Sequence, residues 1–136
     1  MCNKFLYNPA PNSFGWLSKT PDNIKPATII VDQNHRNYII QNNEITIIYN
    51  FTDWCGPCKQ IAAPYNILTH KYEGRAALVK ENVDDEIEGA APVTGVPVFH
   101  IYVRGKHYSD LNITGGDLEL LEKQLLNIIE KVSIHK

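Results

Sequence analysis

The stretch TDWCGPCK at residues 52–59 carries two cysteines with two residues between them. The run just before it, EITIIYNF at 44–51, is rich in apolar residues, which is typical of a strand covered on both faces. After the cysteines, apolar residues recur at helical spacing to about Tyr72. A buried strand that runs into a Cys-x-x-C pair at a helix start is a specific arrangement, and it restricts both the fold and the chemistry.

Three kinds of site could explain the cysteine pair: half of a zinc site, a structural bridge, or a redox pair that opens and closes. A structural zinc ion needs four ligands, and the five histidines are scattered rather than spaced as a second ligand pair. A purely structural bridge would close a very small loop and remove little entropy from the unfolded chain. The sequence therefore favours a redox pair, and we expect no metal and no cofactor besides a Cys55–Cys58 disulfide.

Composition narrows the remaining classes. A chain of 136 residues, 43% of them apolar, is expected to form one globular domain. Positive and negative residues are mixed along the chain and sum to a net charge of −2, so we expect no nucleic-acid partner. The longest apolar runs are too short to cross a bilayer and the N-terminus lacks a signal-peptide stretch, so we expect no membrane partner. Three cysteines fit a cytoplasmic protein with one active pair better than a secreted, disulfide-stapled domain.

The chain divides at about residue 26. Residues 1–26 hold four of the eight prolines and show no period of 2 or 3.6, which predicts an irregular N-terminal arm. Cys2 lies in this arm and is expected to be a free thiol. Residues 27–136 show regular patterns and are predicted to form the domain.

From residue 27 onward, strand-like and helix-like runs alternate. The early part requires parallel crossovers and the late part is antiparallel, which predicts an α/β fold with a mixed central β-sheet flanked by helices on both faces. The predicted elements are a strand at 27–31, a helix capped by Asp32 to about Gln41, a strand at 44–51, a helix from the cysteines to about Tyr72, a strand at 75–83, a short helix within the poorly patterned segment 84–95, a hairpin at 96–113 that turns near Arg104–Gly105, and a helix from Asp117 to about Val132.

The position of the pair at a helix start predicts different roles for its members. Unpaired N–H groups and the helix dipole stabilise an anion there, so the thiol pKa of Cys55 is expected to fall from about 8.5 to about 7. Cys55 is expected to be open to solvent, with Cys58 about one turn further in and more buried. We therefore expect Cys55 to attack a partner disulfide and Cys58 to resolve the mixed disulfide.

The neighbours of the two cysteines suit this chemistry. Gly56 lets a backbone approach closely, and Pro57 fixes φ in the first helical turn, where no N–H is needed. Trp54 either offers a flat apolar edge beside the reactive sulfur or serves only as a packing aromatic.

These residues resemble a known family. WCGPCK at 54–59 is similar to the active-site helix start of thioredoxins, and TGVPVF at 94–99 is similar to their cis-proline loop. VDDE at 83–86 resembles the strand end that comes before that loop. The resemblance covers roughly residues 27–133, and it implies a thioredoxin fold.

The resemblance also implies an activity, that of a protein disulfide reductase. Cys55 would be the nucleophile and Cys58 the resolving thiol, and Gly-Pro between them is the dipeptide of reducing members. Pro97 would be cis, with Val96 pairing its backbone with a client strand and Gly115 lining the same groove. The expected partners are disulfide-containing client proteins and a thioredoxin reductase, and the protein is expected to be a cytoplasmic monomer.

One departure from the family concerns proton transfer. Tyr49 stands where the family has a buried Asp that helps to remove the proton from the resolving cysteine, whereas Lys80 matches the lysine that partners this Asp. We expect Tyr49 to lie beneath the cysteines near Lys80, where it either alters proton transfer or only fills volume.

Three functions remain open at this point. The leading one is a general dithiol–disulfide oxidoreductase. The second is a thioredoxin-like protein dedicated to one client or biased towards an oxidase or binding role, which the substitution at Tyr49 and the arm favour. The third is a binding module with vestigial redox activity, which the intact CGPC motif argues against.

Overall fold

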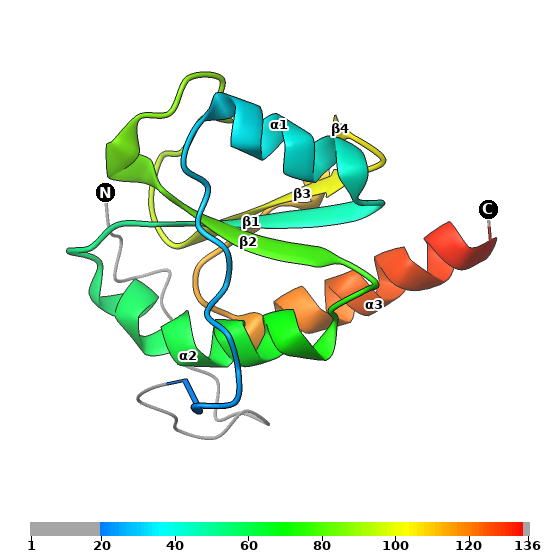
Figure 1. The fold of residues 1–136 in the computed structure, drawn as a ribbon, viewed down its shortest axis with the longest axis horizontal. Coiled ribbons are helices and arrows are strands. Elements are labelled where there is room, and N and C mark those ends of the chain that lie inside the picture. The colour runs from blue at the N-terminus through cyan, green and yellow to red at the C-terminus, as the bar shows by residue number, and fades with distance from the viewer. Residues whose placement is uncertain (1–19, 135–136) are drawn as a thin grey trace.

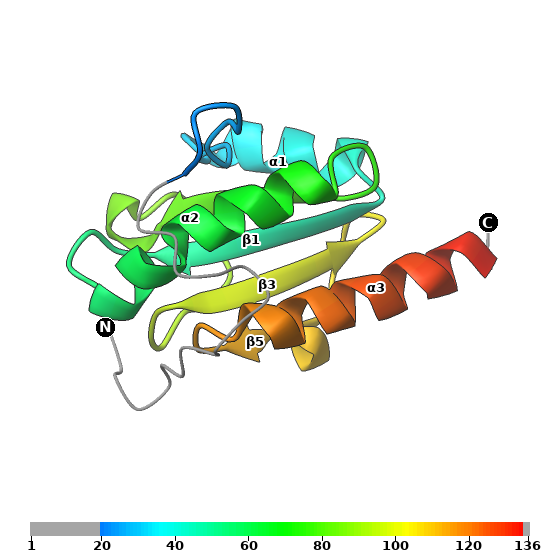
Figure 2. The ribbon, with the colours of Figure 1, turned by 90° about the horizontal axis from the view of Figure 1, so that it is seen from below.

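The computed structural model describes residues 20–134, and the predictions for residues 1–19, including that for Cys2, lie outside this range. A mixed five-stranded sheet forms the middle layer (Figure 1). Helix α1 covers one face, and α2 and α3 cover the other (Figure 2). The predicted fold class is thus confirmed. The elements are α1 (Gln33–Asn42), β1 (Ile45–Phe51), α2 (Gly56–Lys71), β2 (Ala77–Asn82), the 3-10 turn η2 (Val83–Asp85), β3 (Val98–Val103), β4 (Lys106–His107), the 3-10 turn η3 (Ser109–Leu111), β5 (Ile113–Thr114) and α3 (Leu118–Ile134).

The sheet topology determines where the cysteines lie. β1 is flanked by β2, which runs parallel to it, and by β3, which runs antiparallel. Because β3 runs antiparallel, its first residues lie beside the last residues of β1, and Asn50 pairs with Val98. The loop before β3 therefore reaches the start of α2 at one end of the sheet.

Two apolar layers hold the sheet between its helices. The larger one packs alternate side chains of β1 and β3, such as Ile47 and Phe99, against α2 and α3. The smaller one packs side chains of the opposite face, such as Ile48, against α1. The predicted apolar stripe of the last helix is buried in the larger layer, at Leu118, Leu121, Leu125, Ile128 and Val132.

The helix caps follow the prediction. Asp32 accepts a hydrogen bond from the His35 amide at 2.7 Å, and Asp117 accepts one from the Leu120 amide at 3.0 Å. Each carboxylate satisfies an amide that the first helical turn leaves unpaired. No helix among residues 20–134 combines the length and the apolar character that a bilayer crossing requires.

The strand predicted at 27–31 is wrong, because only Ile29 forms an isolated bridge there, with Lys80. Pro26 has no amide to pair, and the amide of Ala27 bonds to Asn66 Oδ1 on α2 at 2.7 Å instead of to the sheet. Asn66 also donates to Thr20 Oγ1 at 2.6 Å, so one buried side-chain amide attaches both Thr20 and Ala27 to α2.

Two further predictions need correction. The short helix predicted within 84–95 is only the turn η2, because the rest of this segment has no regular structure. The hairpin does turn at Arg104 and Gly105, which both have positive φ. Its return strand is split into β4 and β5. Between the pairs Tyr102↔His107 and Phe99↔Ile113, the returning chain has more residues than β3 has. The turn η3 contains the extra residues.

Candidate active site

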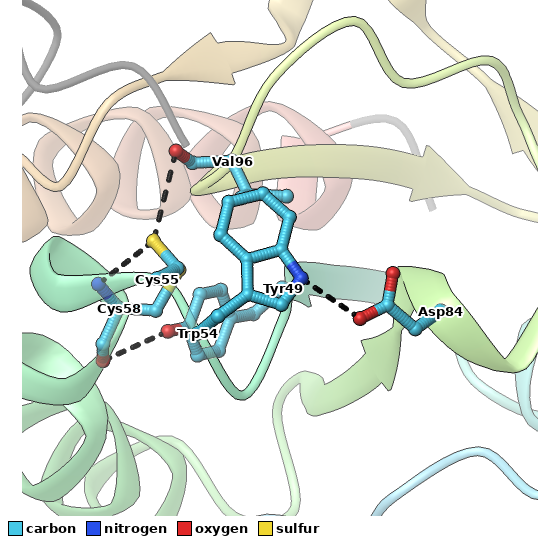
Figure 3. The surroundings of a disulfide bond; sticks show 6 residues. All are labelled: Tyr49, Trp54, Cys55, Cys58, Asp84 and Val96. Atoms are coloured by element: carbon cyan, nitrogen blue, oxygen red, sulfur yellow. Dashed lines mark hydrogen bonds between the residues drawn. A yellow bond between two sulfur atoms is a disulfide. The ribbon is translucent and has the colours of Figure 1, made fainter. Parts of the chain in front are cut away.

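Cys55 and Cys58 form a disulfide where β1 gives way to α2 (Figure 3). Cys55 is the N-cap residue of α2 and Cys58 lies in its first turn, with 5.3 Å between the two Cα atoms. Pro57 also lies in this first turn, as predicted. The helix geometry alone therefore brings the two sulfurs together.

The surroundings of Cys55 suit a thiolate. The backbone amide of Cys58 donates a hydrogen bond to Cys55 Sγ at 3.2 Å. When the disulfide is reduced, this N–H and the positive end of the α2 dipole favour an anion at Cys55.

The predicted difference in exposure between the two cysteines is wrong. Cys55 is 0% exposed and Cys58 is 3% exposed. Cys55 is covered because the loop before β3 lies against it, with the carbonyl oxygen of buried Val96 3.8 Å from Cys55 Sγ. The two sulfurs therefore differ in their polar contacts and not in their access to solvent.

The loop before β3 brings together the residues of the predicted client groove. The Val96–Pro97 peptide bond is cis, as expected. The amide of Gly115 donates to the carbonyl of Pro97 at 2.9 Å, and the φ of Gly115 is +91°, a value that favours glycine. Val96, Pro97 and Gly115 thus form one hydrogen-bonded unit beside Cys55.

Trp54 lies next to the disulfide with 52% of its surface exposed (Figure 3). Its indole N–H donates to Asp84 Oδ2 at 3.0 Å, so the ring is held in place from the turn η2 that follows β2. The amide of Asp84 in turn donates to the side chain of Asn82. Asp84 was not among the predicted site residues, although the VDDE stretch already indicated the strand end that carries it.

Gly56 points into open space. A Cβ atom added at Gly56 would have no heavy atom of another described residue within 4 Å. Its lack of a side chain therefore does not serve packing within residues 20–134.

Tyr49 lies beneath the pair, in the buried position that the sequence predicts. Its ring packs among Phe51, Tyr65 and Phe99, and its hydroxyl donates to the carbonyl oxygen of Cys58 at 3.0 Å. Burial raises the pKa of this phenol well above its usual value, so the hydroxyl keeps its proton. Tyr49 is therefore a neutral donor to the backbone of Cys58.

Lys80 is next to Tyr49 in the sheet, as expected. It pairs with Tyr49 across β1 and β2, and its ammonium lies 5.6 Å from the centre of the Phe51 ring. Both residues line a pocket of about 150 Å³ that also includes Cys58. The sequence reasoning missed this pocket, because its walls come from three separate elements.

The described residues offer no metal site as an alternative explanation for the pair. Within residues 20–134, no group of three or more His, Cys, Asp or Glu side chains could hold an ion. The two sulfurs are instead positioned to exchange electrons with a partner thiol or disulfide.

Comparisons with known proteins agree with this geometry. A family model described as Thioredoxin matches residues 26–128. Thioredoxin 1 of Chlorobaculum tepidum is 37% identical over 71 residues, which are 50% of this chain and 70% of that protein. Thioredoxin 1 of Plasmodium falciparum is 33% identical over 85 residues, which are 61% of this chain and 81% of that protein.

Solved structures give the same answer. The structure of Plasmodium falciparum thioredoxin is 30% identical, with a TM-score of 0.63, over 77% of this chain and 98% of that one. Oxidized mitochondrial thioredoxin 3 from Saccharomyces cerevisiae is 27% identical, with a TM-score of 0.65, over 74% of this chain and 94% of that one.

Proposed function

The chain belongs to the thioredoxin family and is a dithiol–disulfide oxidoreductase, and from this premise we propose that it reduces disulfides in client proteins. Cys55 is the nucleophile and Cys58 the resolving thiol. The observation that carries these roles is the hydrogen bond from the Cys58 amide to Cys55 Sγ at the start of α2. A thiolate at Cys55 gains this bond and the helix dipole, whereas Cys58 lies within the helix.

The reaction has two exchange steps. In the first, Cys55 thiolate bonds to one client sulfur, and the other client sulfur leaves with the electron pair and takes up a proton. In the second, Cys58 thiolate bonds to Cys55 Sγ, and the first client sulfur leaves in the same way. The client gains two electrons and two protons, and the protein ends with the Cys55–Cys58 disulfide.

A client would lie across the groove beside the pair. The open space at Gly56 lets its backbone approach, Trp54 gives one apolar wall, and Val96, Pro97 and Gly115 give the other. An extended client segment can pair with the backbone of Val96 in the manner of an added strand.

The wider setting is part of the proposal. A thioredoxin reductase returns the disulfide to the dithiol, and the protein acts as a monomer in the cytoplasm, where a reducing environment keeps the pair in use. No bound cofactor besides the disulfide takes part. The redox domain includes residues 27–136, and the family match over residues 26–128 supports a boundary near residue 26. Thr20, which lies before this boundary, is attached to α2 through Asn66.

A second candidate is a thioredoxin-like protein that serves one client or is biased towards an oxidase or binding role. Tyr49 supports it, because a neutral hydrogen-bond donor stands where a general reductase has an Asp that accepts a proton.

One experiment separates these candidates: the midpoint potential of the Cys55–Cys58 couple, measured together with the rate of reduction of an unrelated protein disulfide. A general reductase should have a potential near the family's value of about −270 mV and reduce the test disulfide readily. A potential above about −200 mV, or no turnover with the test disulfide, would favour the dedicated or oxidising protein.

A further inference from the structure

In the proposed function, on which this inference rests, the second exchange step needs Cys58 as a thiolate, because a thiolate and not a thiol attacks a disulfide. Cys58 is 97% buried, being only 3% exposed, so its proton needs a defined way out.

Tyr49 cannot take this proton. Its hydroxyl already donates to the Cys58 carbonyl, and burial keeps the phenol protonated. A protonated phenol can donate a hydrogen bond but accepts a proton poorly. The route must therefore begin elsewhere around Cys58.

The pocket of about 150 Å³ lies beside Cys58 and reaches the surface, because Asp53 and Lys59, which line it, are exposed. A water molecule needs only roughly 10–15 Å³ of such space. Thr52 also lines the pocket, and its hydroxyl is buried without a hydrogen-bond partner among the residues that the structure describes. A buried hydroxyl without a partner is commonly satisfied by water.

The charges around this pocket suit a proton route. Among the described residues that line it, Asp53 alone has a carboxylate. Lys59 and Lys80 line the same pocket, and their positive charges favour an anion at Cys58. The other titratable neighbour is Tyr49, which stays neutral.

We infer that the proton of Cys58 leaves through water in this pocket to Asp53, with Thr52 holding the water and Lys59 and Lys80 stabilising the thiolate. The Cys58 electron pair then forms the bond to Cys55, and the bond from Cys55 to the client sulfur breaks. The client sulfur leaves with that electron pair and takes a proton from solvent, to which Asp53 returns its own. Asp53 thereby supplies the proton acceptor that the buried position of Tyr49 lacks.

The test is Asp53→Asn, with the two exchange steps measured separately by stopped flow and a disulfide peptide. Release of the reduced peptide should slow about tenfold at pH 7, less than for a base in direct contact because water relays the proton, and the loss should shrink towards pH 9. Asp53→Glu should restore most of the rate. Asp85→Asn, which removes the same charge from an exposed site outside the pocket, should have no effect.

The first step serves as an internal control. In a Cys58→Ser background, the mixed disulfide should form equally fast with and without Asp53→Asn, because that step does not use the Cys58 proton. Slowing of this step by the same factor would overturn the proposal in favour of a charge effect on client encounter. A pH profile of Asp53→Asn that overlays the parent's would overturn it as well.

A second variant tests the pocket without changing charge. Ala62→Leu should fill the pocket, which Ala62 lines from α2, and slow the release step in the same pH-dependent manner. Asn127→Leu, an exposed change on α3 away from the pocket, should not. Unchanged release in Ala62→Leu would show that water in the pocket is not the route. If Cys58→Ser forms no mixed disulfide at all, it is the proposed function that fails.

Discussion

The two sulfurs of the active site lie in different kinds of surroundings. Cys55 is contacted by backbone groups, namely the Cys58 amide and the Val96 carbonyl. Cys58 is surrounded by side chains, with Tyr49 beneath it and a pocket lined by Asp53 and Lys80 at its side. Backbone contacts come with the fold, whereas side-chain contacts are specific to each sequence. If the proposed roles hold, the nucleophile relies on contacts that the fold supplies, and the side chains around Cys58 are where this sequence can alter the resolving step.

Replacing one cysteine at a time by serine should have the largest effects on disulfide reduction. Cys55→Ser should abolish reduction of a protein disulfide, because the first bond can no longer form. Cys58→Ser should still attack and then stall as a mixed disulfide that mass mapping detects at Cys55. Equal trapping by both variants would reverse the order of attack and remove the contrast between the two sulfurs.

Alkylation tests the same contrast without mutation. In the reduced protein at neutral pH, iodoacetamide should modify Cys55 well before Cys58, because only Cys55 has the helix-start amide as a donor. Earlier modification of Cys58 would mean that its side-chain surroundings lower its pKa more than the backbone lowers that of Cys55.

Replacement of Tyr49 should have the next largest effect, and on the second step alone. Tyr49→Asp should speed peptide release at pH 7 by roughly tenfold, and the gain should shrink towards pH 9 as the thiol ionises without help. It should also lower the free energy of unfolding by about 3–5 kcal/mol, because a ring is lost from an aromatic cluster. Rates are therefore compared below the variant's melting temperature.

Tyr49→Phe separates volume from hydrogen bonding. It keeps the ring, loses the bond to the Cys58 carbonyl, and should cost about 1 kcal/mol in chemical denaturation with no gain in release rate. If the pH profiles of both variants overlay that of the parent, Tyr49 only fills space.

Asp84→Ala should have a smaller effect, on the Cys55 side. Without the bond from its indole, Trp54 is less well held, and mixed-disulfide formation should slow about two- to fivefold in a Cys58→Ser background. Asp85→Ala is the matched control, because it removes a neighbouring carboxylate that does not bond to Trp54. A similar loss in both variants would indicate that client attraction by charge, rather than the position of Trp54, is responsible.

His100 should have no effect on either sulfur, because it pairs with Ile48 and its side chain lies on the sheet face opposite to that of Tyr49. Burial, with a smaller contribution from His107, lowers its pKa to about 4. The unfolded chain binds this proton near pH 6.5 and the folded chain does not, so stability should fall as the pH drops from about 6.5 to about 4, by roughly 3 kcal/mol. His100→Gln should flatten this part of the denaturation profile and leave the peptide-release rate unchanged. A change in that rate would mean that the two faces of the sheet are coupled.

The sequence was sufficient where a feature depends on local pattern. The Cys-x-x-C helix start, the cap at Asp117 and the apolar stripe of α3 are set by residues close together in the chain, and the structure has them where predicted. The sequence was insufficient where the outcome depends on which distant residue forms a hydrogen bond or contact with a backbone or side-chain group. The strand at 27–31 was wrong because Asn66, far along the chain, takes the amide of Ala27.

The active site shows the same division. The position of Tyr49 beneath the cysteines follows from strand alternation, but its bond to the Cys58 carbonyl depends on how α2 lies on the sheet. The roles of Asp84 beside Trp54 and of Asp53 beside the pocket likewise need the end of β2 and the start of α2 in place. Charged residues in turns carry no periodic pattern that would have marked them out.

The hydrogen bonds of Asn66 to Thr20 and Ala27 determine where a truncated form of this protein can begin. Asn66 is buried and uses its amide nitrogen for Thr20 and its amide oxygen for Ala27. A fragment begun at residue 27 would keep every strand and both active cysteines, yet its Asn66 nitrogen would lose its partner on the very helix that carries Cys58. The shortest well-behaved version of this domain should therefore begin at or before Thr20, and a shorter one should loosen α2 first.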